Sequence, residues 1–383
     1  AMAAAVTTRP SRVRAAIAAL VTVSILAPAG IMVAWLWNDN QDQRTSTTLE
    51  QQGVEYLADL SPLISGLVEA QSSALQGVAA APAALTAAVG RVSTTDQRLG
   101  DPLATHERWS GLRDKIARLP AVTGSTADIF QAHVEVTNLA LALYNSVRKN
   151  AELIRDPDND LSNLQEALAV DLPSAVVAVS RMGDLAQMVA GVTGGATQRQ
   201  QTLAVLVPQF GAAIQQVNTD VFNLTDNLQS AVDNTHSGTL SGNLVSSVDS
   251  FRRGVEAFTR GADPTGGKPN AGTMATAQSQ LQTSLSGLAG VLIREMNGLL
   301  TDRLYRLDTR RLQLLISAGA LVLLVLLSLV LGLTGRRRAV PAPEHTSRGP
   351  AEQPDGYSSG PLDPMPNYGD TSATRRERSG ALR

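Results

Sequence analysis

The chain of 383 residues contains no cysteine. It therefore has neither a disulfide framework nor the thiolate ligands of the common structural zinc sites. Histidine is also scarce: only His106, His133, His236 and His345 occur, and no two have the spacing of a His-x-x-x-His or His-Glu-x-x-His motif. These absences argue against a metal site, and we expect no metal and no other cofactor.

Aromatic residues make up only 3% of the chain, whereas hydrophobic residues as a whole make up 43%. A core must therefore be built mainly from alanine, leucine and valine, which suits closely packed helices. The formal net charge is −2. A balance so close to neutrality argues against a nucleic-acid partner.

Catalytic signatures are missing as well. Residues 261–268 (GADPTGGK) superficially resemble a phosphate-binding loop, but Lys268 stands one place late and Pro269 replaces the required serine or threonine. The chain has no Gly-x-Ser-x-Gly sequence and no kinase signature set. We therefore expect no catalytic residues and do not expect an enzyme.

Two long uncharged runs are present, one of 23 residues (15–37) and one of 20 residues (314–333). At about 1.5 Å per helical residue, either run covers the roughly 30 Å hydrocarbon core of a bilayer. A membrane-crossing segment must be helical because lipid offers no partner to a bare backbone N–H or C=O. The sequence therefore predicts two transmembrane helices.

The first run has an alternative interpretation. Basic residues followed by Ala27-Pro28-Ala29 resemble a secretory signal with its cleavage site. However, the run continues for eight residues beyond Ala29 and ends in Trp35 and Trp37, which is typical of a membrane interface. These features favour an uncleaved anchor, in which Pro28 kinks the helix without ending it.

Basic residues flank both runs on the sides nearest the chain termini, with arginines before residue 15 and at 336–338. The positive-inside rule then places both termini in the cytoplasm of a two-pass protein of the cell (inner) membrane. The predicted organisation is a cytoplasmic N-terminus (1–14), transmembrane helix 1 (15–37), an extracytoplasmic helical domain (38–311), transmembrane helix 2 (312–334) and a cytoplasmic tail (335–383). The tail is rich in Pro, Gly, Ser and Arg, and we expect it to be disordered.

Apolar residues recur at alternating spacings of three and four over most of the extracytoplasmic segment, and each series predicts one buried helix face. The series are Leu49, Gly53, Tyr56, Leu60, Leu63 and Leu67; Ile129, His133, Val136, Ala140, Leu143 and Val147; Val207, Phe210, Ile214, Val217, Val221, Leu224 and Leu228; and Leu281, Leu285, Leu288 and Leu292. The predicted fold is all-α, with the first and last outer helices continuous with the membrane helices. About eight outer helices would form two stacked four-helix bundles or one long bundle of interrupted helices.

Turn-forming residues predict where the helices break. The predicted breaks are at Ala81-Pro82, Gly100-Asp101-Pro102, Leu119-Pro120 with Gly124-Ser125, Asp156-Pro157-Asp158, Gly194-Gly195 and residues 261–269.

Arg181 is the one candidate ligand-binding residue. It lies in an apolar stretch between Val179 and Met182. One interpretation is an ion pair with Asp184, one turn later in a helix. The other is an inward-facing arginine that holds an anionic ligand.

Two stretches resemble the extracytoplasmic sensor regions of bacterial chemoreceptors and sensor histidine kinases. Residues 153–160 (LIRDPDND), followed by Leu172-Pro173, resemble a turn and a later Leu-Pro that recur between helices in those regions. Residues 67–77, with Arg91 and residues 94–96, resemble the opening of the nitrate/nitrite-sensing helical domains of actinobacterial sensor kinases. The resemblance implies a helical sensor fold. It does not extend to nitrate, because residues 45–90 lack the arginines and lysines that would pair with the anion.

A transmitter module is not found after residue 338, so we do not expect the chain to phosphorylate a partner. Two hypotheses remain. In the first, the outer domain binds a partner protein or a small ligand and the chain acts as a receptor or co-receptor. In the second, it is a structural or accessory scaffold subunit of a cell-envelope complex. Expected partners are the lipid bilayer, proteins of the membrane or envelope, and a second copy of the chain in a homodimer.

Overall fold

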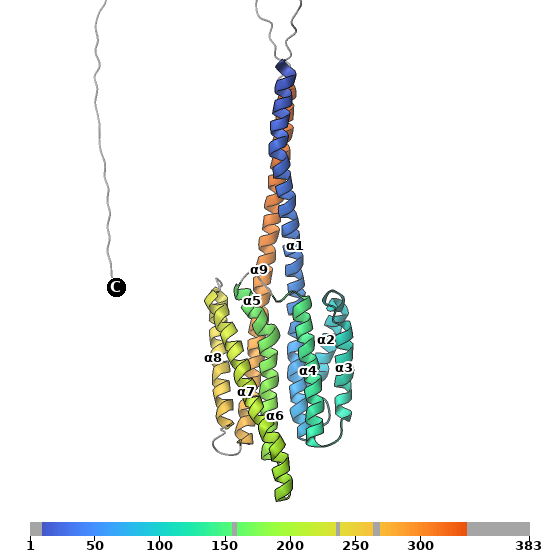
Figure 1. The fold of residues 1–383 in the computed structure, drawn as a ribbon, viewed down its shortest axis with the longest axis vertical. Helices are drawn as coiled ribbons and strands as arrows, with labels where there is room; N and C mark the ends of the chain where they lie inside the picture. Colours follow the sequence, from blue (N-terminus) through green and yellow to red (C-terminus); the bar gives the residue numbers. More distant parts are fainter. Residues whose placement is uncertain (1–9, 155–158, 235–237, 263–268, 335–383) are drawn as a thin grey trace, which may run out of the picture. The chain divides into compact units, whose positions relative to one another are not determined.

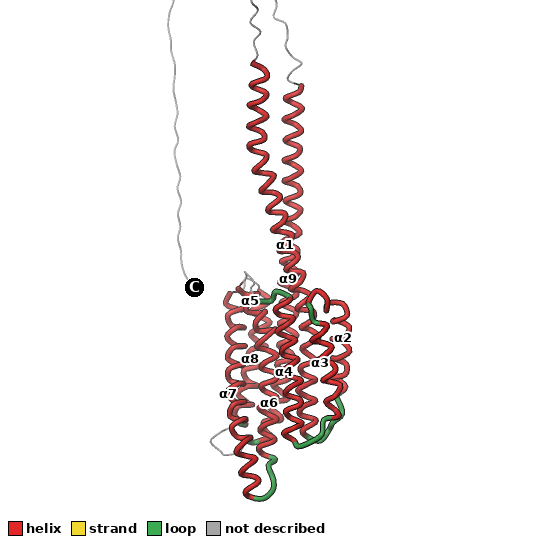
Figure 2. Tube along the Cα trace, turned by 45° about the vertical axis from the view of Figure 1, so that its right-hand side comes forward, coloured by secondary structure: helices red, strands yellow, loops and turns green. Residues whose placement is uncertain are grey.

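The computed structural model describes residues 10–154, 159–234, 238–262 and 269–334. Within these ranges the regular structure is helical and no strand occurs (Figures 1 and 2), which confirms the predicted all-α class. The chain divides into two compact units, Ala1–Ser328 and Leu329–Arg383, and each is considered by itself. The second is described only over the last six residues of a helix (329–334), so the predicted disordered tail (335–383) lies outside the described residues.

The helices follow one another with short connections. They are α1 (Pro10–Leu75), α2 (Ala83–Leu103), α3 (His106–Arg118), α4 (Thr126–Asn150), α5 (Asn159–Glu166), α6 (Leu172–Ala190), α7 (Ala196–Asn234), α8 (Gly238–Gly261) and α9 (Ala271–Thr334). A 3₁₀ turn (Leu119–Ala121) follows α3, and a π-helical stretch (Ala167–Asp171) joins α5 to α6 without a break.

The outer part of α1 packs with α2, α3 and α4 into a first four-helix bundle. The predicted apolar seam of α1 faces this core, since Tyr56, Leu60 and Leu67 each expose 1% of their surface or less. In the α4 seam, five of the six predicted positions are buried and the sixth is half-buried. Both seams are therefore confirmed, and hydrophobic burial along them holds the bundle together.

A second four-helix bundle consists of α6, α7, α8 and α9 (Figure 1). The four predicted seam leucines of α9, from Leu281 to Leu292, have no exposed surface. Gln282 of α9 donates to the carbonyl of Val176 in α6 over 3.0 Å, which ties the two helices together. The α7 seam is confirmed except at Val207, which is 51% exposed because the buried face of α7 passes through Leu206 instead (7% exposed) at this level. The amino-terminal part of α7 projects beyond α8 and α9 (Figure 2).

The two bundles lie side by side, joined by contacts of α6 with α1 and with α4 (Figures 1 and 2). The predicted stacking of one bundle on the other is therefore wrong. The reason is the position at which the next helix, α5, begins after α4. Arg148 near the end of α4 pairs with Glu166 of α5, so α5 and α6 start at the level where α4 ends and run back alongside it.

The helix breaks fall close to the predicted turns, with one exception. α2 continues through Gly100 and Pro102 to Leu103, and the turn comes at Ala104, which has a left-handed φ of 47°. Pro102 is tolerated because it removes a hydrogen bond only in the last turn of a helix that is already ending. The predicted turn at Asp156 and most of the 261–269 connection lie outside the described residues.

Two helices are far longer than the rest: α1 has 66 residues and α9 has 64. Both include a predicted membrane span and continue from it into the bundles without interruption, and α1 stays helical through Pro28 and Pro62. Among the residues that the structure describes, one helix, α9, is long and apolar enough to cross a membrane. An 18-residue window within Ala271–Ser328 has a mean hydropathy of 2.0, and none of that window is buried.

Candidate functional site

α1 and α9 are joined by polar contacts just beyond the predicted spans. The side-chain amide of Asn40, which is 6% exposed, donates to the backbone carbonyl of Leu307 over 3.1 Å. Arg44 forms an ion pair with Asp308 at 3.1 Å. These contacts fix the register of α1 against α9, because a slip by one turn would leave the buried Asn40 amide without its acceptor.

Deeper in the protein, α1 and α9 share a buried ion pair. The Arg303 guanidinium lies 3.5 Å from the Glu50 carboxylate, with only 15% and 6% of the two side chains exposed. Gln165 of α5 also donates to Glu50 over 3.5 Å, so three helices meet at this carboxylate. Removing either ion would leave the other charge buried, which makes this junction sensitive to relative movement of the helices.

α1 meets α6 through a buried carboxylate, that of Asp184. Asp184 exposes none of its surface. Its carboxylate accepts hydrogen bonds from Gln71 and Ser72 of α1, both at 2.7 Å, and from Ser180 at 3.4 Å. Burial raises the pKa of Asp184 to about 6, although the three hydrogen bonds oppose this rise. The contact between the two bundles therefore contains a group that titrates near neutral pH.

Arg181 does not pair with Asp184, so that prediction is wrong. Its guanidinium donates to the side chain of Asn138 over 2.6 Å and to the carbonyl of Val134 over 3.5 Å, both in α4. The two residues point to different neighbours, Asp184 to α1 and Arg181 to α4. Burial lowers the pKa of Arg181. Arg181 thus links the bundles, and it does not line any of the grooves described below.

The two histidines that the structure describes occupy different settings. His133 is 4% exposed in the α4 seam, its Nδ1 has no hydrogen-bond partner, and burial lowers its pKa. The half-exposed His106 ring lies between two carboxylates, 2.7 Å from Asp96 and 3.0 Å from Asp101. The hydrogen bond to Asp96 is the main cause of a raised pKa for His106. His236 and His345 lie outside the described residues.

The π-helical stretch places a buried carboxylate, that of Asp171, in the second bundle. Asp171 is 5% exposed and accepts a hydrogen bond from Asn227 of α7 at 2.6 Å. Burial raises the pKa of Asp171 to about 6, and the nearby carboxylates of Glu166 and Asp220 raise it further. Asp171 and Asp184 therefore titrate over a similar pH range.

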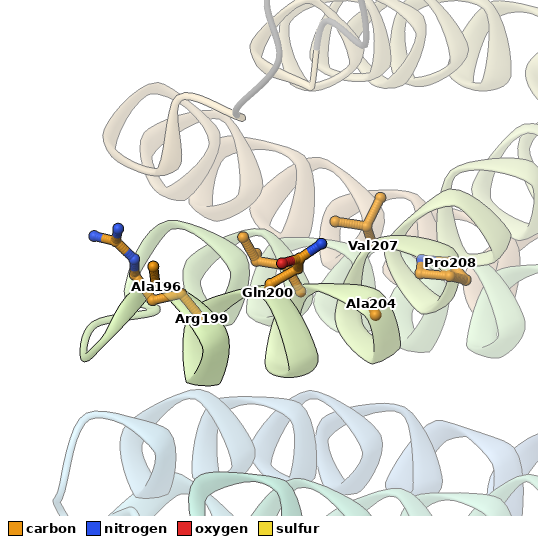
Figure 3. A pocket seen from close by; sticks show the side chains of 7 residues that line it. Ala196, Arg199, Gln200, Ala204, Val207 and Pro208 are labelled. Atoms are coloured by element: carbon orange, nitrogen blue, oxygen red, sulfur yellow. The ribbon is translucent and has the colours of Figure 1, made fainter.

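An open groove runs along the projecting part of α7 (Figure 3). Its lining comes from α7 alone and includes one charged side chain, Arg199, beside Gln200 and the apolar Val207 and Pro208. The labelled side chains follow the helix surface and do not converge on one point. Residues from a single helix define no fixed geometry for a ligand, so this groove offers an exposed surface and not a built site.

A second groove lies between α1 and α9 beside the predicted spans. It is lined by Asp39, Asn40, Arg310 and Gln313 among others. In the part of the chain that the structure describes, no group of three or more His, Cys, Asp or Glu side chains is arranged to hold a metal ion.

The sequence did not predict most of the buried polar contacts that join α1 to α6 and α9. Glu50 stands beside the predicted seam residue Leu49, Asn40 lies three residues beyond the first predicted span, and Asp184 lies in the same apolar stretch as Arg181. A polar residue next to an apolar seam is the signal that could have found them, but it was applied only to Arg181. Charged residues beside a seam usually point to water, so the signal is weak without the neighbouring helix.

Comparisons with protein-family models, with curated proteins and with solved structures found no match for this chain.

Proposed function

We propose that this chain is a two-pass membrane receptor or co-receptor whose outer helical domain binds a partner protein or a small ligand. In this proposal, both α1 and α9 cross the membrane and both termini are cytoplasmic. The apolar run of α9, the uncharged run at 15–37 and the arginines that flank them support it. The Arg311 guanidinium lies 4.9 Å from the Trp37 ring centroid, a pairing suited to the outer membrane boundary.

One observation carries the proposal: the two membrane helices belong to different bundles. α1 continues into the first bundle and α9 into the second, each without a break. A helix that runs unbroken from a bundle into a span transmits displacement along its axis. In this proposal, a ligand that changes the packing of one bundle against the other also shifts α1 against α9.

Engineered disulfides test this coupling in the full-length protein. The chain has no cysteine, so Gln51→Cys with Thr301→Cys places one cysteine pair across α1 and α9, where the Gln51 amide nitrogen donates to the Thr301 hydroxyl over 3.3 Å. Replacing Asp184 by leucine disturbs the contact between α1 and α6 at a distance from this pair. We expect the rate of disulfide formation in native membranes to change several-fold.

The matched control is Asp226→Leu, which makes the same exchange at an exposed position of α7. This variant should leave the disulfide rate unchanged. An unchanged rate in the Asp184→Leu protein, with its helical content intact, would show that the bundles are not coupled to the membrane helices.

Topology is tested with single cysteines and a membrane-impermeant maleimide. A cysteine at Val207 should be labelled in intact cells, whereas a cysteine at Ser347 should be labelled only after the membrane is opened. Labelling of Ser347 alone in intact cells would reverse the proposed orientation.

The second candidate is a scaffold subunit of a cell-envelope complex, and the filled core favours it. Leucines and alanines pack the bundle axes, and the two grooves described above are open to solvent. Affinity purification from native membranes separates the two functions. A stoichiometric protein complex without any change in α1–α9 cross-linking would favour the scaffold.

We also propose that the chain forms a homodimer, and we expect its interface to lie away from the seam leucines of α9. Residues Leu281 to Leu292 have no exposed surface because they face the chain's own second bundle. Two exposed residues, Phe222 of α7 (69% exposed) and Val245 of α8 (52%), are better positions for single cysteines that report on a second copy.

A further inference from the structure

Most cations of the first bundle are paired with a carboxylate. The pairs are Arg91 with Asp59, Arg98 with Glu55, Arg113 with Asp114, Lys115 with Glu135 and Arg148 with Glu166. Arg108, Arg118 and Lys149 have no such partner among the residues that the structure describes. Two of these three, the exposed Arg108 and Lys149, line the same groove.

Arg108 of α3 and Lys149 of α4 line one groove of about 380 Å³. Asn145 and Ser146 of α4 also line it, and neither side chain makes a hydrogen bond within the described residues. The lining contains no carboxylate. We name this groove, defined by Arg108, Asn145, Ser146 and Lys149, the α3–α4 groove. It offers a guanidinium, an ammonium, an amide and a hydroxyl, four donors from two helices.

The two helix ends at the groove contribute potentials of opposite sign. The carboxyl end of α4 favours the cation of Lys149 in its last turn, whereas the amino end of α3 favours an anion. Arg108 lies in the first turn of α3, where the helix dipole disfavours a cation. Thr105 precedes that turn, but its hydroxyl donates to Asp96 and caps no backbone N–H of α3. Two carboxylates are close in sequence. Asp101 contacts the ring of His106, and the exposed Glu107 is the next residue after His106. Neither of the two acids lines the groove.

We propose that the α3–α4 groove binds a small phosphate-bearing anion. Two unpaired cations repel each other, and an anion bound between them removes this repulsion. A phosphate oxygen pair matches the guanidinium fork of Arg108, while a third oxygen is available to Lys149 or Ser146. The proposed function supplies the consequence of binding, since this groove belongs to the bundle that carries α1.

The position of the groove favours a free anion over a lipid headgroup. Ser46 of α1 donates to Glu152, just after α4, so this end of the bundle lies at the level of Ser46. Ser46 is nine residues beyond Trp37, which corresponds to about 14 Å along a helix. The headgroup layer outside the hydrocarbon core is only about 5 to 8 Å thick. With Trp37 at the membrane boundary, lipid phosphates are nearer to the membrane than the groove.

Inorganic phosphate is the probe that tests the site. The full-length protein, in nanodiscs of phosphatidylcholine alone, is titrated with phosphate at constant ionic strength while its Tm is measured. We expect a saturable rise in Tm. The double variant Arg108→Gln and Lys149→Gln should weaken phosphate binding by about tenfold or more, because two charge-assisted hydrogen bonds are lost.

Arg118→Gln is the matched control, because Arg118 is an exposed, unpaired arginine of the same helix outside the groove. This control should bind phosphate as the wild type does. Nanodiscs that contain phosphatidylglycerol identify the source of the anion. If the headgroup occupies the groove, the wild type but not the double variant gains Tm there and loses its response to added phosphate.

A wild type with no saturable response in either nanodisc, or a double variant that responds as the wild type does, overturns the site. The Gln51/Thr301 disulfide rate is measured in parallel. If phosphate binds but leaves that rate unchanged, the site stands and the proposed signalling function fails.

Discussion

At the scale of single residues, Asp184 shows how a buried acid links stability to pH. Its pKa is raised by burial to about 6, above the value of 3.8 that is ordinary for an aspartate. The folded protein therefore binds a proton more tightly than the unfolded chain. The stabilisation of the folded protein by this bound proton is fully present below pH 3.8 and is lost as the pH rises through 6.

This sign predicts the behaviour of Asp184→Asn. The amide resembles the protonated acid, so the variant should match the wild type only below pH 3.8, where Asp184 is protonated in both the folded and the unfolded protein. At pH 7.5 it should be more stable, by about 1 to 3 kcal/mol, because the wild type must keep a charge buried there. Urea unfolding below pH 3.8 and at pH 7.5 measures the difference. The exposed Asp226→Asn variant is the control, and equal pH slopes for all three proteins would contradict the assignment.

The buried pair of Glu50 and Arg303 leads to a second prediction at this scale. Replacing Arg303 by methionine removes the Arg303 guanidinium from the buried Glu50 carboxylate, and we expect a loss of about 3 kcal/mol in the free energy of unfolding. Adding Glu50→Gln should restore most of that loss. A double variant as unstable as the single one would show that packing by Arg303, and not charge, is what matters.

At the scale of helices, substitutions at two glycines distinguish the effect of close helix packing from that of helix propensity. A Cβ at Gly66 of α1 would lie 2.8 Å from the Cα of Leu85 in α2, which is backbone and cannot rotate away. A Cβ at Gly90 of α2 would have no atom within 4 Å. Gly66→Ala should therefore destabilise the protein by about 1 to 3 kcal/mol. Gly90→Ala should stabilise it by about 0.5 to 1 kcal/mol through helix propensity.

Thermal and denaturant unfolding of the two alanine variants, compared with the wild type, measures both effects. The substitution is the same in each protein, so opposite signs can come only from the surroundings. Two changes of equal sign would mean that α1 and α2 are not in contact at Gly66.

The same helices show how far sequence reasoning reaches. The 3-4 spacing correctly predicted the buried faces of α1, α4 and α9, because burial needs one continuous apolar stripe on each helix. It could not predict which stripe faces which. Arg181 and Asp184 illustrate the limit: their spacing permits an ion pair, yet the neighbours α4 and α1 draw them apart. The side-by-side arrangement of the bundles could not be predicted either, because the spacing does not show which helix faces which.

At the scale of the whole chain, the two bundles should unfold as one cooperative unit. α6 of the second bundle packs against α1 and α4 of the first, and α1 and α9 share buried polar contacts. Separating the bundles would therefore expose Asp184, Glu50 and Arg303 together. A fragment of residues 38–311 contains all of these contacts, and we expect it to fold without detergent.

This fragment carries its own probe of the first bundle. It excludes Trp35 and Trp37, so Trp109, which is 3% exposed in α3, is its only tryptophan. Trp109 fluorescence follows the first bundle alone, whereas far-UV circular dichroism follows the helices of both. We expect the two urea transitions to coincide in the wild-type fragment. Earlier loss of the fluorescence signal would mean that the first bundle unfolds independently, and displacement of one bundle could then be absorbed within the outer domain without reaching α9.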